Sequence, residues 1–414
     1  MRAIAFSTLT AASILSSAFA IAPARAASAS LTQLAQSEAP AIAQNNAAAD
    51  RARASLQKIK LPQGFSIQLY AMAPDARSLM VGPNGTVFVG TTDDKLYALR
   101  DSKGVGRADD VRLFAPQVRF RIPHGLCFDK DGALYVVEQN RVQMFPNAEA
   151  SVGSATPDMR VLVEHGKLIP VSEESGNHTT RMCRVGPDGK LYISFGQPYN
   201  VPPADKVKLY DETGIGGVIR MNRDGSAREV FTRGIRNSVG MDFNPKDGTL
   251  WFTDNQVDGM GDDIPPGELN RQTAPGQHFG FPWYGGGKVR TGDYARSEPP
   301  KSVIFPQVEM DAHAADLGMT FYTGTMFPER YRNAIFSAQH GSWNRSVSIG
   351  ARVMVTTLKS DQTADRTEIF AQGWRDPNGA YWGRPVDVAV LKDGSLLVSD
   401  DRIGAVYRIT YAAK

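Results

Sequence analysis

The chain has 414 residues, with 46 Lys and Arg against 43 Asp and Glu, and its length alone allows one large domain or two. The formal net charge of +3 is mild and no run of Lys and Arg stands out, which gives little support to nucleic-acid binding. After residue 26 no segment is apolar for long enough to cross a bilayer, so no membrane span is expected.

Residues 1–26 have the pattern of a secretory signal peptide. They contain one early Arg, an apolar stretch with small residues, and Ala-x-Ala sites at residues 18–20 and 24–26. A membrane anchor is the less favoured alternative, because the apolar stretch is shorter than the ~20 residues that a span needs and is interrupted by Ser and Thr. We therefore expect a periplasmic or secreted protein.

Residues 27–60 are rich in Ala, Gln, Asn and Ser and have almost no large apolar side chains. This composition predicts a tether outside the fold, either flexible or partly helical. The folded domain is expected to span residues 61–414.

One short pattern recurs through that domain: a strand, a tight turn with Asp-Gly or Asn-Gly, and a second alternating strand. Because Asn-Gly and Asp-Gly supply the positive φ angles that a hairpin turn requires, each copy predicts a β-hairpin. The copies begin at Val81, Phe128, Val185, Phe243 and Val390, and a degenerate sixth copy, which lacks the glycine turn, begins at Phe327.

The spacing of the copies predicts the architecture. Gly85, Gly132 and Gly189 are separated by 47 and 57 residues, a period suited to a four-stranded unit with variable loops, and helical patterns are nearly absent. Six such units predict an all-β fold, a six-bladed β-propeller. Residues 259–287, which are rich in Gly and Pro, are expected to form a long functional loop.

In a propeller, the residues just before the inner strands and the loops that join the blades lie on one face around the axis. Polar residues at these positions are therefore expected to converge. The candidates are Arg121, His124, Asn177, His178, Arg181, Arg236, Asn237, His340, Trp343, Asn344, Arg345, Arg384 and Asp387. A ring of Arg and His repels itself unless an anion fills it, so this set predicts an anionic ligand.

Some of these residues also have a purely structural interpretation. His178 could satisfy backbone groups in a turn, and Arg236 with Asn237 could bond loop carbonyls, since buried polar side chains need partners in any case. The segment from His340 to Arg345 is harder to explain in this way, because a flat Trp beside an Arg suits a planar ligand that bears carboxylates.

The segment 254–268 carries five carboxylates close to glycine turns. Donor sets made only of oxygen suit Ca²⁺, although the spacing is not that of an EF-hand and a solvated acidic loop is an equal alternative. The sequence contains no Cys/His set with zinc spacing and no Gly-rich phosphate loop between a strand and a helix, so zinc, NAD and ATP sites are not expected.

The two cysteines, Cys127 and Cys183, lie in apolar segments with strand patterns. We interpret them first as buried small apolar residues. A disulfide remains an alternative, since the protein is expected to be exported.

From "LPQGFSIQLYA" at Leu61 to "VYRITY" ending at Tyr411, the chain resembles the glucose/sorbosone dehydrogenase family, especially its sorbosone and pyranose dehydrogenase branch. The motifs that carry the resemblance occur in family order: "GNHTTR", "GIRNSVGMDF", "GDDIPPGELN", "HFGFPWYGG", "QHGSWNR" and "GRPVDVAV". The resemblance implies a six-bladed propeller that binds pyrroloquinoline quinone (PQQ) with Ca²⁺ and oxidises sugars or sugar aldehydes. PQQ is a flat tricarboxylate, which would neutralise the Arg/His ring.

The resemblance also implies catalytic roles. His178 matches the general base of the family's soluble glucose dehydrogenases, although Asn177 stands where those enzymes have an acid. An Arg, expected to be Arg236, would stabilise the oxyanion that forms. The electrons are expected to pass to an external acceptor, a quinone or a cytochrome, because the sequence has no Cys-x-x-Cys-His for covalent haem.

Binding roles follow from the same resemblance. Arg384 matches the first member of an Arg-x-Arg that binds cofactor carboxylates, and Arg345 or His340 is expected to replace a family lysine. The calcium ion is expected at the carbonyls of Gln256 and Val257, with the carboxylate of Asp258 nearby. The residues expected to bind the cofactor are Arg121, His124, Asn237, His340, Trp343, Arg345 and Arg384.

Two rival functions stay open at this point. A calcium-dependent propeller hydrolase of the lactonase kind would need carboxylates and amides converging from several blades, whereas here the converging groups are cationic. A propeller that binds a protein or glycan without catalysis is the second rival, because a fold by itself does not fix a function.

Overall fold

The computed structural model describes residues 38–413 of the chain. The predicted signal peptide and residues 27–37 of the predicted tether lie outside these described residues. Neither of the two α-helices among them is both long and apolar enough to cross a membrane.

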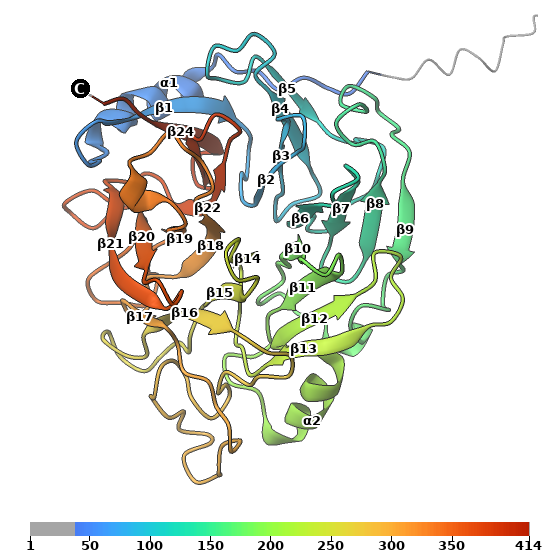
Figure 1. Cartoon of the computed structure of the whole chain (residues 1–414), viewed down its shortest axis with the longest axis vertical. Coiled ribbons are helices and arrows are strands. Elements are labelled where there is room, and N and C mark those ends of the chain that lie inside the picture. The colour runs from blue at the N-terminus through green and yellow to red at the C-terminus, as the bar shows by residue number, and fades with distance from the viewer. Residues whose placement is uncertain (1–37, 414) are drawn as a thin grey trace, which may run out of the picture. The chain divides into compact units, whose positions relative to one another are not determined.

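Six four-stranded antiparallel sheets surround a central axis, so the predicted six-bladed β-propeller is confirmed (Figure 1). The first strand of each blade lies nearest the axis. Blade one contains β2 (Leu79–Val81), β3 (Val87–Val89), β4 (Tyr97–Arg100) and β5 (Asp110–Leu113). Blade two contains β6 (Gly125–Phe128), β7 (Leu134–Val137), β8 (Val142–Phe145) and β9 (Arg160–Val163). Blade three contains β10 (Cys183–Val185), β11 (Leu191–Phe195), β12 (Gly217–Met221) and β13 (Glu229–Arg233). Blade four contains β14 (Met241–Phe243), β15 (Leu250–Asp254), β16 (Gly267–Gln272) and β17 (Val308–Met310). Blade five contains β18 (Asp316–Phe321), β19 (Ile335–Gln339), β20 (Arg352–Leu358) and β21 (Ala364–Gln372).

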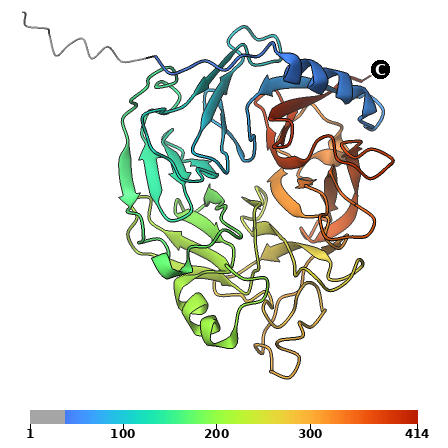
Figure 2. The ribbon, with the colours of Figure 1, turned by 180° about the vertical axis from the view of Figure 1, so that it is seen from behind.

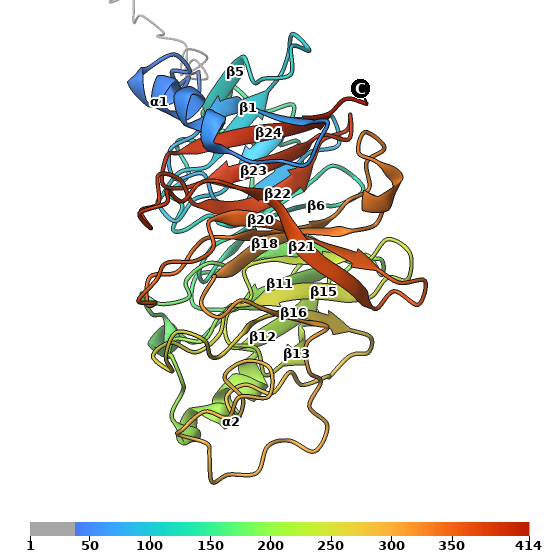
Figure 3. The same cartoon turned by 90° about the vertical axis from the view of Figure 1, so that its left-hand side faces the viewer.

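The sixth blade joins the two ends of the described chain. It contains β22 (Pro385–Val390), β23 (Leu396–Asp400) and β24 (Ala405–Tyr411), and its outer strand is β1 (Phe65–Met72). β1 pairs with β24 from Phe65 opposite Tyr411 to Met72 opposite Ala405, and Figure 3 shows the two strands side by side. The ring of blades is therefore closed by backbone hydrogen bonds between distant parts of the sequence.

The hairpin predictions are confirmed. Each Asp-Gly or Asn-Gly turn joins the first two strands of a blade, and its glycine has a positive φ, for example +97° at Gly85 and +73° at Gly189. The degenerate copy joins β18 and β19 through a longer loop that contains the short 3₁₀ helix η4 (Glu329–Tyr331). The expected loop 259–287 is only partly a loop, because it contains β16, the third strand of blade four.

The predicted tether is wrong for residues 38–60, which pack against the propeller. Helix α1 (Ala47–Ser55) buries Ala49 and Ala52 in the same apolar cluster as Met72, and it continues into the 3₁₀ helix η2 (Leu56–Lys58). Figure 2 shows α1 beside the C-terminal strands. An alanine-rich segment can pack in this way because small side chains let a helix approach a sheet closely, so few large apolar residues are needed. The other helices are α2 (Ala204–Thr213) and η3 (Val171–Glu173).

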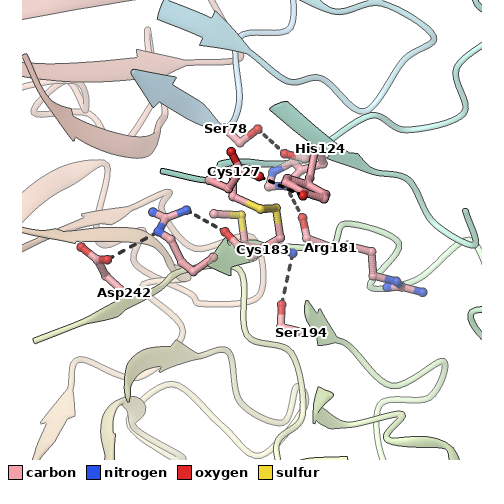
Figure 4. The surroundings of a disulfide bond; sticks show 11 residues. Ser78, His124, Cys127, Arg181, Cys183, Ser194 and Asp242 are labelled. Carbon is pink, nitrogen blue, oxygen red and sulfur yellow. Dashed lines mark hydrogen bonds and ion pairs between the residues drawn. A yellow bond between two sulfur atoms is a disulfide. The ribbon is translucent and has the colours of Figure 1, made fainter. Parts of the chain in front are cut away.

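Cys127 in β6 and Cys183 in β10 are buried, as predicted, but they form a disulfide, so the preferred interpretation as free thiols is wrong. The two residues are 56 positions apart in sequence and 5.6 Å apart between Cα atoms, a separation that a disulfide spans. They come together because β6 and β10 are the inner strands of neighbouring blades. Figure 4 shows the disulfide beside the hydrogen bond from His124 Nδ1 to the carbonyl of Arg181, 3.0 Å long.

Candidate active site

A cavity of about 210 Å³ lies where the loops before the inner strands meet the loops after the second strands. The antiparallel order of each blade brings these two kinds of loop to the same face. Seven residues that were predicted to act in catalysis or to bind the cofactor or calcium line the cavity: His178, Arg236, Asn237, Gln256, Asp258, His340 and Trp343; the further candidate Asn344 lines it as well. A larger cavity, of about 540 Å³, contains none of the predicted site residues.

Five residues with a predicted catalytic or binding role do not line this cavity, and neither do the further candidates Asn177, Arg181 and Asp387. Arg121 is half exposed and pairs with Glu174 at 2.9 Å, and His124 is buried below the loops. Val257 is buried, and its backbone N–H donates to a loop carbonyl. The side chain of Arg345 is bonded to the segment 262–263.

Arg384, the fifth of these, braces a loop with its guanidinium. Its Nε donates to the carbonyl of His340 at 3.0 Å, and its Nη2 donates to the carbonyl of Gly341 at 2.6 Å. Arg181 is used in the same manner, since it donates to the carbonyls of Gln139 and His178. Both arginines therefore bond loop carbonyls, the role that the sequence left open for Arg236, and the ring of cations at the cavity is smaller than predicted.

His178 has a fixed protonation pattern. Its Nδ1 lies 2.5 Å from the carbonyl oxygen of Gln197, which can only accept, so Nδ1 carries the proton and the neutral ring has its lone pair on Nε2. Burial, helped by the charge of Arg236, lowers the pKa of His178 to about 4. The imidazole is therefore neutral at ordinary pH, and it lines the cavity.

Arg236 is held from several sides. Its guanidinium donates to the carboxylate of Asp258 at 2.9 Å, to the side chain of Asn200 at 2.8 Å, and to the carbonyl of Asn255 at 3.1 Å. Its side chain is 4% exposed. Because so many acceptors fix the guanidinium, its charge stays at one position of the cavity wall.

Three buried oxygens at the cavity lack a hydrogen-bond donor among the described residues: Oδ1 of Asn237, Oε1 of Gln256 and Oδ2 of Asp316. A buried acceptor without a partner is costly. Burial also raises the pKa of Asp316 to about 7. A cation bound by these oxygens would remove both penalties, and amide and carboxylate oxygens are the ligands that Ca²⁺ prefers.

The predicted calcium ligands are only partly brought together. Gln256 lines the cavity, but Val257 does not, and Asp258 is engaged by Arg236 and by Asn344, whose Nδ2 lies 2.7 Å away. Within the described part of the chain, no group of three or more His, Cys, Asp and Glu could hold a metal ion. The unpartnered oxygens at the cavity are two side-chain amide oxygens and one carboxylate oxygen.

The acidic segment 254–268 does not converge on one point. Asp262 and Asp263 contact the loop 345–346 at the surface. Asp254 ends β15 and lies opposite Glu268 in β16, and both carboxyl groups are buried. Burial raises the pKa of both groups, and the charge of Asp254 raises that of Glu268 further. Asp254 accepts from the backbone N–H groups of Arg236 and Asn237, so it positions these residues.

Sequence reasoning missed several lining residues, among them Arg77, Asn255 and Asp316. Arg77 precedes the inner strand of its blade, as His178 and Arg236 do, and this position could have identified it. His313 also lines the cavity; its Nε2 lies 2.8 Å from the carbonyl of Gly261, so it anchors the neighbouring loop.

The chain is similar to several known proteins. The family model described as glucose/sorbosone dehydrogenase matches residues 126–408. An uncharacterized protein of Borreliella burgdorferi is 29% identical over 363 residues, which cover 85% of this chain and 91% of that protein. An aldose sugar dehydrogenase of Escherichia coli is 26% identical over 256 residues, which cover 57% of this chain and 61% of that enzyme.

Solved structures share the fold at lower identity. The calcium structure of a Trichoderma reesei family AA12 carbohydrate-active enzyme superposes with a TM-score of 0.71 at 18% identity, covering 86% of this chain and 97% of that one. The holo form of the PQQ domain of pyranose dehydrogenase from Coprinopsis cinerea superposes with a TM-score of 0.68 at 17% identity, covering 85% and 97%. Because the family match spans well over half of the chain, this protein belongs to the glucose/sorbosone dehydrogenase family and is an oxidoreductase of the sugar dehydrogenase type.

Proposed function

We propose that this protein oxidises a sugar or sugar aldehyde, either an aldose or a sorbosone-like substrate, with PQQ and Ca²⁺ as cofactors. The observation that carries the proposal is the pairing, in one cavity, of a neutral imidazole with a free Nε2 and three buried oxygens that lack donors. The Nε2 lone pair of the imidazole suits proton abstraction from a hydroxyl group, and the three oxygens suit a bound cation.

The lining residues fit the cofactor's chemistry. Arg77 and Arg236 offer positive charge to carboxylates, and Trp343, which is 75% exposed, offers a flat ring at the cavity rim. Asn237, Gln256 and Asp316 would hold the cation. When bound, PQQ supplies the carbon that accepts hydride, and Ca²⁺ polarises the adjacent carbonyl.

His178 takes the proton in this proposal. Its Nε2 accepts the proton of the C1 hydroxyl of a sugar, or of an aldehyde hydrate, while the hydrogen on the same carbon leaves as hydride. Arg236 stabilises the negative charge that develops on oxygen. The carbonyl of Gln197 holds the ring in the required tautomer throughout.

The protein is proposed to act in the periplasm or outside the cell. The signal peptide predicted from the sequence supports export, and so does the disulfide between Cys127 and Cys183, because disulfides persist in oxidising compartments. The two electrons are then passed to an external quinone or cytochrome.

Reconstitution tests the function. The purified apoprotein is mixed with PQQ and Ca²⁺, and reduction of a dye is followed with a panel of aldoses, sorbosone and simple aldehydes. We expect reduction that depends on substrate and on both additions, and that a chelator abolishes. A protein that binds no PQQ would contradict the proposal and favour a hydrolase or a docking role.

A matched pair of variants tests the cation ligands. Asp316→Asn should raise the Ca²⁺ concentration for half-maximal activation about tenfold or more, because it removes a buried carboxylate charge from the site. Asp311→Asn changes a half-exposed carboxylate on the same segment that pairs with Arg352, and it should leave this concentration unchanged. Equal behaviour of the two variants would exclude Asp316 as a ligand.

A further inference from the structure

Asp401 lies between two residues of the cavity wall. Its carboxylate oxygens are 2.9 and 3.0 Å from Nε2 of His340, and one of them also accepts from Nη1 of Arg77. The three side chains are between 13% and 15% exposed. His340 and Arg77 line the central cavity, whereas Asp401 does not.

The contacts fix the protonation of His340. Burial by itself would raise the pKa of Asp401, but His340, Arg77 and Arg384 hold that pKa below its usual value, so the carboxylate is ionised and can only accept. Nε2 of His340 therefore carries the proton, and the lone pair of the neutral ring is on Nδ1. Burial lowers the pKa of His340 to about 4; Asp401 opposes this change, and the charges of Arg77 and Arg384 add to it.

Asp401 also lines a second cavity, of about 260 Å³, which lies against the N-terminal segment at Ile42 and Ala43. Asp75 is another carboxylate of that cavity. The pair His340–Asp401 thus connects the central cavity with a separate outer cavity by one hydrogen bond.

We propose that His340 and Asp401 form a proton exit from the active site. The inference rests on the proposed function, in which oxidation of one hydroxyl to a carbonyl releases two electrons and two protons. The first proton goes from the substrate oxygen to His178. The second hydrogen leaves the carbon as hydride, that is, as a proton with two electrons. Once both electrons have passed to the external acceptor, the proton of that hydride remains and must leave the site. Nδ1 of His340 accepts this proton, and Nε2–H releases one through Asp401 to the outer cavity.

The two imidazoles of the cavity differ in a way that suits these roles. Behind His178 is a neutral carbonyl, which accepts the hydrogen bond of Nδ1–H but cannot take the proton from the ring and pass it on. Behind His340 is a carboxylate, which stabilises an imidazolium and can pass a proton on. Asp401 is thus a positioning residue for His340, and it is also the group that connects the ring to the outer cavity.

The test measures the two half-reactions of the PQQ- and Ca²⁺-loaded enzyme separately. Rapid mixing with sugar gives the rate of cofactor reduction, and mixing of the reduced enzyme with a proton-coupled quinone acceptor gives the rate of reoxidation. In Asp401→Asn we expect reoxidation to slow at least tenfold more than reduction, with a larger solvent deuterium isotope effect on reoxidation. Since Asp401→Asn leaves Arg77 unpaired, His340→Gln is the second variant: it can still donate to Asp401 but cannot carry a proton, and it should give the same selective loss.

The control is Asp75→Asn, which changes a carboxylate of the outer cavity that bonds residues 92–93 and does not contact His340. Its half-reactions should match those of the wild type.

A readout on the apoprotein is independent of activity: ¹⁵N NMR at neutral pH should show His340 protonated at Nε2. Protonation at Nδ1, or equal slowing of both half-reactions in Asp401→Asn and His340→Gln, would overturn the proposal. If the wild type fails to reduce its cofactor with any sugar, the proposed function itself is wrong.

Discussion

At the scale of single residues, His178 is held in a backbone conformation that residues other than glycine rarely adopt. Its φ is +50°, in the left-handed region. The carbonyl of Gln197 fixes its ring, and Nη1 of Arg181 donates to the backbone carbonyl of His178 at 2.8 Å. Surrounding contacts therefore maintain a strained residue at the cavity, which is where strain is most often found to serve function.

The proposed role of His178 predicts a specific loss. His178→Gln should lower kcat by about 10²–10⁴-fold, the usual contribution of a general base, while the affinity for PQQ changes little. The acid limb of the wild-type pH profile should lie near pH 4, because protonation of a residue with a pKa of about 4 removes the lone pair only below that pH. Steady-state kinetics and cofactor titration measure both quantities.

A histidine outside the cavity provides the control for this variant. His165 is half exposed and pairs with Glu174 at 2.8 Å, so His165→Gln should leave kcat unchanged. If His178→Gln also retained full turnover, another group would have to take the substrate proton.

At the scale of elements, the inner strands position the site. β6 and β10 carry the disulfide, and three residues before Cys127 the ring of His124 bonds the carbonyl of Arg181. The loop that contains His178 is thereby tied to the neighbouring blade on one side. On the other side, the buried carboxylate of Asp254 at the end of β15 fixes the backbone of Arg236 and Asn237.

Removal of the disulfide should therefore affect stability first. The double substitution Cys127→Ala and Cys183→Ala is expected to lower the free energy of unfolding by about 2–4 kcal/mol, because the crosslink closes a loop in the unfolded chain. Chemical denaturation with and without a reducing agent measures the loss. Wild type in reductant should approach the variant, and the variant should not respond to reductant; a variant as stable as oxidised wild type would contradict the prediction.

At the scale of the whole molecule, the ring is closed by β1, and α1 reinforces the closure. Phe65 in β1 packs edge-on against Phe327 and Phe370, with ring centres 4.8 and 5.0 Å apart. Ahead of β1, Gln44 exchanges two hydrogen bonds with the backbone of Met72, 2.7 and 3.0 Å long. The N-terminal segment therefore contributes to the closed ring rather than acting as a spacer.

Truncation tests this account of the segment. A chain that begins at Leu61 should fold but be about 1–3 kcal/mol less stable than one that begins at Glu38, because it lacks the buried face of α1 and the hydrogen bonds of Gln44. A chain that begins at Ala73 lacks β1, exposes the edge of β24, and should not give a cooperative unfolding transition. Equal stability of the first two chains would support the tether predicted from composition.

Most of the fold could be predicted from the sequence, because hairpin turns depend on local backbone geometry. The glycine turns at Gly85 and Gly189 identify strand pairs directly, and their spacing gives the number of blades. The site was predicted less completely. The location of His178 and Arg236 just before inner strands identified them as site residues. The same rule did not distinguish side chains that line the cavity from those that brace loops, such as Arg384.

The sequence by itself determined the repeating hairpins, the six blades, the family and the segments that supply the site. Only the tertiary structure decided which side chains share the cavity, that Cys127 and Cys183 are joined, that α1 belongs to the fold, and that Asp401 stands behind His340. The physical reason is that turns and strand patterns depend on neighbouring residues. Contacts between blades depend instead on how distant segments meet around the axis, and a linear pattern does not contain that information.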